Sequence, residues 1–399
     1  MNNYDIIIVG AGISGLSLAH YSAKKRLKTL VIEKNDRVGG TFQSHYFPEI
    51  SSDFWIELGA HTCYSSYGNL LNIMEELSLM DQAVRKEKVG YKMFADGKIT
   101  SIFSQINLVE FLLSAPRLFT MKKKGLSIES YYSRIVGSNN FRKVFGPLFN
   151  AVICQNAEDF PADLLFKKRA RRKDVLKSFA MCHGLQSITK AIAGEAGIDL
   201  VTGKAVDNIL TNRGHFIVTS EGGNTFESPF LALAAPASVA AALLQISFSD
   251  ISQALSRIRV EPVETVGVAL RKNACSLPPL AGIIARNDIF YSAVSRDSLK
   301  DEDYRGFAFH FKYGASDHES KLGRISEVLG VAREKLDLVV TTHNSVPSLR
   351  IGHDALIGEI DRLLSGKRLL LTGNYFSGVS IEDCISRSLD EITRLDTLL

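Results

Sequence analysis

The sequence is poor in the residues that build metal centres and disulfide frameworks. Its 399 residues include only five cysteines, scattered over positions 63, 154, 182, 275 and 384. No Cys-x-x-Cys pair and no cysteine–histidine ligand spacing occurs, so zinc and iron–sulfur sites are not predicted. An odd and dispersed set of cysteines fits reduced thiols in the cytoplasm. We therefore expect no bound metal, and a chain of this length can bury a sufficient core without disulfides.

Long apolar runs and targeting signals are also absent. No run of 18 or more apolar residues occurs, which argues against a membrane-spanning helix. The N-terminal residues lack the basic region and the small-residue cleavage site of a signal peptide. We expect a cytoplasmic location, with peripheral contact to the inner face of the membrane as the alternative.

The excess of charge of one sign is small. The formal net charge is +4, and residues 167–173 contribute six basic residues in seven. The favoured interpretation of this run is a solvated surface helix, and contact with an anionic membrane or an acidic substrate is a second one. A single short run is not the broad basic surface of a nucleic-acid-binding protein, so no nucleic acid is expected as a partner.

The first forty residues have the pattern of a dinucleotide-binding βαβ unit. The apolar run 4–9 suits a strand that is buried on both faces of a parallel sheet. A Gly-x-Gly-x-x-Gly turn, a helical segment and a second apolar run, 29–32, follow it. In such a turn Gly10 permits the tight bend, Gly12 lets the backbone approach a pyrophosphate, and Gly15 allows close helix–strand packing.

Two further features complete this unit. The helix begins at Ile13 and Ser14, and the free N–H groups of its first turn would point at the phosphates. Glu33 lies 18 residues after Gly15, where a carboxylate can accept hydrogen bonds from ribose hydroxyls. The order of strand, helix, strand and acid predicts dinucleotide binding, but it does not distinguish FAD from NAD.

The residues after the second strand carry a family resemblance. Lys34 and Arg37 precede the paired Gly39 and Gly40, and Thr41 follows. A glutamate, an arginine and paired glycines in this order resemble the FAD site of the flavin-containing amine oxidase and protoporphyrinogen oxidase superfamily. The resemblance implies FAD as the cofactor. It places Arg37 near the diphosphate and the paired glycines beside the ribityl chain.

The end of the chain is similar to the C-terminal flavin motif of the same family. Residues 367–371 read as a strand, and apolar residues at helical spacing begin at Ile381. The resemblance assigns five residues of the intervening turn to the flavin: Gly373, Asn374, Gly378, Val379 and Ser380. The first two would lie by the diphosphate and ribityl group, and the next two near the isoalloxazine ring. Ser380 with Asp383 predicts a helix-capping pair.

A third block in the middle of the chain completes the predicted nucleotide domain. Strand-like segments alternate with turns there: 198–204, 216–219 and 230–236. In the family a valine near position 206 meets the adenine through its backbone, which assigns Val206 to this role. We predict an α/β fold with a discontinuous Rossmann-like FAD-binding domain and an inserted α+β substrate domain. The FAD-binding domain would comprise 1–60, 196–240 and 364–399, and the substrate domain 61–195 and 241–363.

The inserted segments have no specific motif. Residues 61–195 are predicted to be mainly helical, and 241–363 to mix helices with strands such as 264–270 and 305–311. Residues 108–124 are apolar and then basic. Ordinary buried helices are the favoured interpretation of this stretch, ahead of an interfacial helix pair on a membrane.

Within the superfamily, details of the C-terminal part favour protoporphyrinogen oxidase. Residues 347–353 are similar to its Pro-x-x-x-x-Gly-His segment. The resemblance implies an FAD-dependent oxidoreductase that moves a hydride from a substrate C–H bond to flavin N5. Oxygen or another acceptor would then reoxidise the flavin. The substrate would be a small molecule, a tetrapyrrole or else an amine. The chain departs from the family after Ile385, where serine and arginine replace the usual glycine.

Catalytic residues are not identified by the sequence. Three candidates are His61, Lys272 and Tyr291, for which a structural histidine, a surface lysine and a core tyrosine are competing interpretations. Other functions stay open as well. An amine oxidase, a polyene desaturase or a galactopyranose mutase would keep the flavin. A flavin-free binding protein similar to the GDP-dissociation inhibitors is an alternative of another class, against which the complete set of glycines argues.

Overall fold

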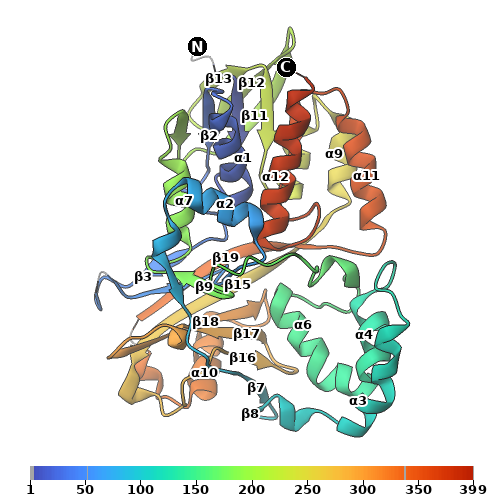
Figure 1. The fold of residues 1–399 in the computed structure, drawn as a ribbon. Helices are drawn as coiled ribbons and strands as arrows, with labels where there is room; N and C mark the ends of the chain where they lie inside the picture. The colour runs from blue at the N-terminus through green and yellow to red at the C-terminus, as the bar shows by residue number, and fades with distance from the viewer. Residues whose placement is uncertain (1–3, 52, 337, 399) are drawn as a thin grey trace.

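The computed structural model describes residues 4–51, 53–336 and 338–398. It is organised around two large sheets, one in the upper half and one in the lower half of the molecule (Figure 1). Both chain ends lie at the top, on the side away from the lower sheet (Figure 1). The mixed α/β fold class predicted from the sequence is confirmed.

The upper sheet is a parallel sheet in the order β10–β2–β1–β14–β20, and every pair of neighbours runs parallel. Its strands are β1 (Ile6–Val9), β2 (Thr29–Ile32), β10 (Ile198–Val201), β14 (Phe230–Leu233) and β20 (Leu369–Leu371). Helices cover both faces, so strands such as β1 bury every side chain and read as continuous apolar runs. Three segments that are far apart in the sequence therefore share one sheet.

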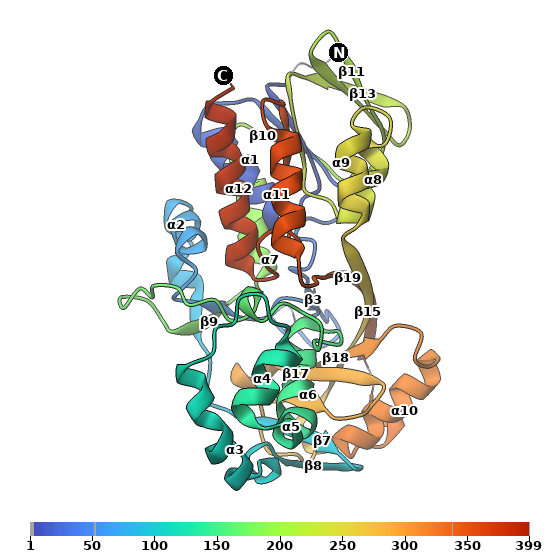
Figure 2. The same ribbon diagram turned by 90° about the vertical axis from the view of Figure 1, so that its right-hand side faces the viewer.

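The two faces of this sheet have different covers. One face, with Ile6 and Ile8, packs against α1 (Ile13–Lys24), α2 (Gly68–Glu76), α7 (Gln186–Ala193) and α12 (Ile381–Asp396). The other face, with Ile7 and Val9, shares a core with α8 (Ala237–Leu244), α9 (Ser249–Ser256) and α11 (His353–Leu364). Helices α1, α11 and α12 stand side by side in Figure 2. The predicted domain boundaries stay a prediction, and this packing sets α2, α7, α9 and α11 beside the upper sheet.

A small antiparallel sheet flanks the top of the molecule. It consists of β11 (Val206–Asn212), β12 (His215–Ser220) and β13 (Asn224–Ser228). Its first strand begins at the residue that the sequence assigned to the adenine, Val206.

The lower sheet is mixed and has the order β19–β15–β18–β17–β16–β7–β8. Its members are β7 (Tyr91–Ala95), β8 (Lys98–Ser101), β15 (Arg259–Arg271), β16 (Gly282–Ala285), β17 (Phe290–Ser295), β18 (Tyr304–Lys312) and β19 (Leu338–Ser348). The long strands β15 and β19 reach up towards the upper half (Figure 1). Helix α10 (His318–Leu329) packs with the phenylalanines of β18. Two of these strands, β15 and β18, contain the predicted strands 264–270 and 305–311.

A group of helices lies beside the lower sheet. It includes α3 (Leu108–Ser114), α4 (Ile128–Val136) and α6 (Gly146–Ile153) (Figure 2). The prediction that 108–124 forms ordinary buried helices is wrong, because most large side chains of α3 and of the 3₁₀ turn Ala115–Phe119 are exposed. No helix within the described ranges is both long and apolar enough to cross a membrane.

Candidate functional site

The turn between β1 and α1 is so tightly packed that it requires glycine. Gly10 has φ +104°, and a Cβ there would lie 2.7 Å from the Ala234 carbonyl oxygen. At Gly15 a Cβ would lie only 1.9 Å from the Gly10 carbonyl oxygen. Gly12 is the N-cap of α1, and neither a capping side chain nor an acidic residue occupies the first turn. The N–H groups and positive end of this helix are therefore free to receive an anion.

A second pair of glycines closes over this turn. Gly39 has φ +117° and forms a β-bridge with Gly12, and its N–H donates to the Ala11 carbonyl at 2.8 Å. A Cβ on Gly40 would lie 3.2 Å from the Cα atom of Gly12. Bare backbone thus lies on both sides of the helix N-terminus, a cradle that side chains would fill. We call Gly10, Gly12, Gly39 and Gly40 the glycine cradle, and it fits the diphosphate of FAD.

Glu33 is placed where the resemblance puts the ribose. Its carboxylate is buried and accepts a hydrogen bond from Ala11 N at 2.8 Å. The other carboxylate oxygen accepts two hydrogen bonds from Asn35, while Lys34 is exposed. Lys204 N donates to the Glu33 carbonyl at 3.0 Å, so the segment that leads into Val206 runs beside Glu33. The two residues assigned to the adenosine half are thereby brought into one neighbourhood.

Arg37 supports the second pair of glycines. Its Nη2 donates to the Gly40 carbonyl at 3.0 Å and to Gln43 Oε1 at 2.9 Å. Gln43 Oε1 also accepts from Thr342 Oγ1 on β19 at 3.1 Å. Burial lowers the pKa of Arg37, with the Glu33 charge acting in the opposite direction. The guanidinium therefore ties the Gly39–Gly40 loop to the long strand that reaches up from the lower sheet.

The first and last motifs of the chain meet through hydroxyl groups. Ser388 Oγ on α12 donates to the Ser14 carbonyl in the first turn of α1 at 2.8 Å. It also lies 2.8 Å from Thr372 Oγ1, directly before Gly373 and Asn374. Ile13, next to Ser14, is buried. The end of β20, the start of α1 and the first turns of α12 thus form one structural unit.

The turn that opens α12 contains the predicted capping pair and two unexpected cations. Ser380 caps the helix with Asp383 in a reciprocal capping box, which confirms the prediction. A Cβ on Gly378 would lie 2.7 Å from the Asp383 carboxylate, so this glycine lets the turn with Val379 close against the acid. The same carboxylate pairs with Lys167 Nζ at 2.9 Å and Arg169 Nη2 at 2.7 Å.

These cations correct one prediction. Residues 167–173 form no helix, and they do not stay in solvent as a surface helix would. Lys167 and Arg169 instead cover the start of α12, while Arg172 pairs with Glu75 at 2.6 Å. They bring positive charge to a helix N-terminus whose first turn holds two acids. The basic run was visible in the sequence, but its contact with a turn more than 200 residues away was not.

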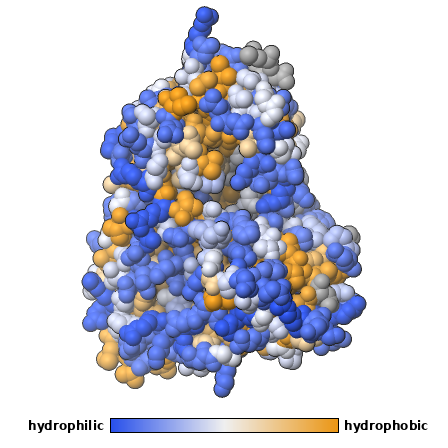
Figure 3. Space-filling model, turned by 180° about the vertical axis from the view of Figure 1, so that it is seen from behind, coloured by the Kyte–Doolittle hydropathy of each residue, from blue (hydrophilic) through white to orange (hydrophobic). Residues whose placement is uncertain are grey.

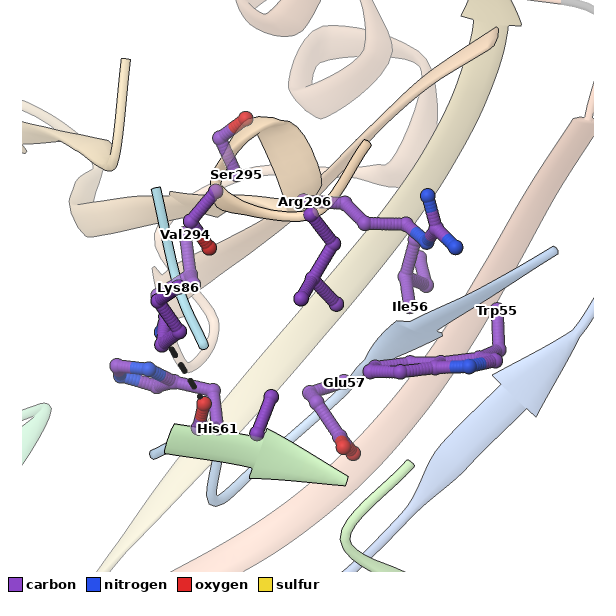
Figure 4. Close-up of a pocket in the computed structure, with 11 residues that line it drawn as sticks. Trp55, Ile56, Glu57, His61, Lys86, Val294, Ser295 and Arg296 are labelled. Carbon is purple, nitrogen blue, oxygen red and sulfur yellow. Dashed lines mark hydrogen bonds between the residues drawn. The ribbon is translucent and has the colours of Figure 1, made fainter. Parts of the chain in front are cut away.

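A polar cluster lies next to the loop that follows the glycine cradle. The Thr41 carbonyl accepts a hydrogen bond from Ala60 N at 3.0 Å, although the Thr41 side chain is exposed. His61 comes next, and Lys86 Nζ donates to its carbonyl at 3.3 Å and to Thr62 Oγ1 at 2.7 Å (Figure 4). Thr62 Oγ1 lies 2.9 Å from His61 Nδ1. Glu57, His61 and Lys86 line a small cavity of about 30 Å³, which has room for water but not for a substrate.

Burial changes the proton affinity of every ionisable group in this cluster. It raises the pKa of Glu57 to about 7, against the hydrogen bonds from Leu185 N and Ser44 Oγ. It lowers the pKa of His61 to about 3, with a smaller effect of the Lys86 charge, and also lowers the pKa of Lys86. His310 on β18 has a pKa lowered to about 4 by burial. Both histidines are therefore neutral at pH 7.

We expect Glu57→Gln to gain stability relative to the wild type as the pH rises from 5 to 7. A carboxyl whose pKa is raised from 4.5 to about 7 by folding destabilises the fold increasingly over this range, because only the unfolded chain ionises freely. Glutamine cannot ionise, so the difference in unfolding free energy should move by about 2 kcal/mol in favour of the variant. His61 and His310 act with the opposite sign but are present in both proteins. Urea unfolding at pH 5, 6 and 7 measures this difference, and parallel curves would contradict the expectation.

The other two catalytic candidates lie elsewhere. Lys272 is exposed at the end of β15 and contacts the Asp301 carbonyl, as expected for a surface lysine. Tyr291 is half-buried on β17, with Lys312 Nζ 5.6 Å from its ring centroid. It lines a cavity of about 540 Å³ between α4, α6 and the β16–β17 turn. Of the three candidates, only His61 lies beside the loop of Thr41.

Sequence reasoning missed several polar residues near the predicted flavin segments. They are Gln43, Glu57, Lys86, Lys167, Arg169, His310 and Thr342. No motif marks them, and only the basic run offered a signal. His353, from the segment similar to protoporphyrinogen oxidase, donates to the Tyr375 carbonyl at 2.6 Å and so fixes the chain after Asn374.

The chain matches the family of flavin-containing amine oxidoreductases over residues 13–304. A probable flavin-containing monoamine oxidase A of Dictyostelium discoideum is 21% identical over 59% of this chain and 58% of that protein. A 15-cis-phytoene desaturase of Narcissus pseudonarcissus is 34% identical over 21% of this chain and 14% of its own length. The chain thus spans just over half of the first of these relatives and a small part of the second.

Solved structures show the same fold. One from Exiguobacterium sp. 255-15, which has a provisional assignment as a protoporphyrinogen oxidase, superposes with a TM-score of 0.80 at 16% identity, covering 99% of this chain and 100% of that one. A reduced UDP-galactopyranose mutase superposes with a TM-score of 0.74 at 15% identity, covering 99% and 96%. The chain therefore belongs to the flavin-containing amine oxidoreductase family, whose members are FAD-dependent oxidoreductases, as predicted from the sequence.

Proposed function

We propose that the protein is an FAD-dependent oxidoreductase of the protoporphyrinogen oxidase type, which moves a hydride from a substrate C–H bond to flavin N5. The observation that carries this proposal is the glycine cradle at the uncapped N-terminus of α1. A chain that had lost its cofactor would be free to replace these glycines, yet each of them is still required by the backbone. This argues against the flavin-free binding protein.

The residues of the chain would have separate roles. The N-terminus of α1 would hold the diphosphate, and Glu33 the ribose of the adenosine half, with Val206 beside the adenine. The turn of Gly373, Asn374, Gly378, Val379 and Ser380 would meet the other half of the cofactor. When bound, FAD supplies the electron sink for the hydride. The neutral His61 and His310 and the Lys86 ammonium would set the charge and the water content on this side.

The cavity beside Tyr291 supports a small anionic substrate. Its volume of about 540 Å³ is in the range of small-molecule sites. Arg134, Arg142 and Lys312 line it and can hold carboxylates, although three acids line it too. Propionate side chains of a tetrapyrrole would use such cations, whereas the ammonium of an amine would not. The segment 347–353 and the provisional assignment of the Exiguobacterium structure support the same choice.

The expected result of an anaerobic reduction assay is bleaching of the bound flavin by protoporphyrinogen and not by amines. The purified protein is mixed with each compound without oxygen, and the flavin absorption band is followed, because reduction of the cofactor is the step that the proposal requires. Bleaching by an amine alone would replace the proposal by an amine oxidase. A protein that stays colourless after incubation with FAD would overturn every flavoenzyme function.

We also propose the cytoplasm as the compartment and oxygen or another small acceptor as the oxidant. All five cysteines are free thiols in the structure, which fits a reducing environment.

A further inference from the structure

One corner of the molecule exposes a concentrated set of large apolar side chains. Seven of them, 54–89% exposed, come from α3 and its two flanking 3₁₀ turns: Phe103, Leu108, Val109, Leu112, Leu113, Leu118 and Phe119. We call these seven residues the α3 surface. In the view from behind, apolar residues reach the lower left edge, the corner that α3 occupies, while most of the lower half is hydrophilic (Figure 3). A soluble monomer rarely exposes so many large apolar residues together.

The α3 surface faces outwards because the opposite side of the helix is already packed. Phe111 stacks on Phe145 with ring centroids 6.5 Å apart, and Ser114 is buried. Glu110 accepts hydrogen bonds from Asn139 N at 2.8 Å and Asn140 N at 3.1 Å. The helix is therefore fixed in its orientation. Its outward residues follow i, i+4 spacing, which gives one continuous apolar face.

Basic residues border this face, and acids are nearly absent. Arg117, Lys122, Lys123 and Lys124 lie within or directly after it, and Arg117, Lys122 and Lys124 are exposed. Glu110 is the only acid between residues 103 and 127, and its carboxylate is engaged on the inner side. The segment thus carries four positive charges against one negative charge, which itself faces away.

We propose that the α3 surface docks on an anionic lipid bilayer, with its apolar side chains inserted at the level of the headgroups and the lysines on the lipid phosphates. An apolar face with a basic border is the pattern of a helix that lies in the membrane interface. The charge complementarity selects this occupant, because a second copy would bring the same positive charges together. The proposal goes beyond the proposed function, and it requires neither turnover nor a particular substrate.

The test is vesicle flotation of the full-length protein. We expect binding to vesicles of phosphatidylcholine with phosphatidylserine, and weaker binding to phosphatidylcholine alone. Leu112→Glu with Phe119→Glu should lower the bound fraction at least about tenfold, because both side chains would enter the interface. Replacing Lys122, Lys123 and Lys124 by glutamine should remove the preference for phosphatidylserine and its dependence on salt.

The matched control is Ile246→Glu, which changes an apolar residue that is 77% exposed between α8 and α9. This variant should float like the wild type. Circular dichroism and thermal unfolding check that each variant folds, which is expected because the substituted side chains are on the surface. Absence of wild-type flotation, or equal loss in the control, would overturn the proposal. So would a wild-type dimer in light scattering that Leu112→Glu with Phe119→Glu converts to a monomer, because a second copy would then cover the face.

Discussion

Gly15→Ala is expected to yield a protein that no longer retains FAD and that unfolds about 3 kcal/mol more easily than the wild type. The added Cβ would lie 1.9 Å from the Gly10 carbonyl oxygen, and both atoms belong to rigid backbone. Helix α1 would have to move away from β1, and its N-terminus would leave the glycine cradle. The flavin-to-protein absorbance ratio after purification measures retention of the cofactor, and urea unfolding measures the stability.

Gly323→Ala is the matched control for this substitution. Gly323 is exposed inside α10, and a Cβ there would meet nothing within 4 Å. Alanine should therefore keep the flavin and stabilise the helix by about 0.5–1 kcal/mol. A Gly15→Ala protein with normal flavin content would show that the helix N-terminus does not hold the diphosphate.

Asp297→Ala is expected to cost about 3–5 kcal/mol, because it leaves the Arg305 guanidinium buried without its counter-charge. The two side chains are only 5–6% exposed, and Arg305 Nε donates to Asp297 Oδ1 at 3.0 Å. Asp297 also accepts from Leu280 N at 3.1 Å. It lies in the turn after β17, next to residues that line the small cavity of His61. Urea unfolding measures the loss.

The surface pair of Arg257 and Glu359 provides the comparison. These side chains lie 2.7 Å apart but are 57% and 39% exposed, so Glu359→Ala should cost less than about 1 kcal/mol. Replacing both Asp297 and Arg305 by apolar residues should cost less than Asp297→Ala alone, since no charge stays buried. Equal losses for the buried and the exposed pair would contradict this account.

The parts of the fold that the sequence predicts are those whose causes are local. The turn of Gly10, Gly12 and Gly15 needs glycine because the backbone of neighbouring segments touches it, and such a requirement is visible in a short motif. Strands β1 and β2 are apolar throughout because helices cover both faces. The family resemblance then supplied the assignments at the far end of the chain. The structure shows where those residues lie, while their binding of FAD stays a prediction.

The parts that the sequence did not reveal depend on contacts between distant segments. Lys86 reaches the loop of His61 from another strand, and Lys167 reaches Asp383 across more than 200 residues. Nothing in the local pattern indicates these partners. The orientation of α3 was missed for a related reason. An apolar face has the same spacing whether it points into a core or into solvent, so Leu108 and Leu112 looked like core residues.

The hydroxyl of Ser388 has a consequence for the order of assembly. It joins the first turn of α1 to the end of β20, so the earliest and latest elements of the described chain depend on each other. A ribosome makes α1 first and α12 last, and the chain emerges in that direction. The glycine cradle can therefore exist as a local turn early in synthesis, but its cover arrives only after all other elements have been made. Cofactor loading on this scaffold is an event of the finished chain.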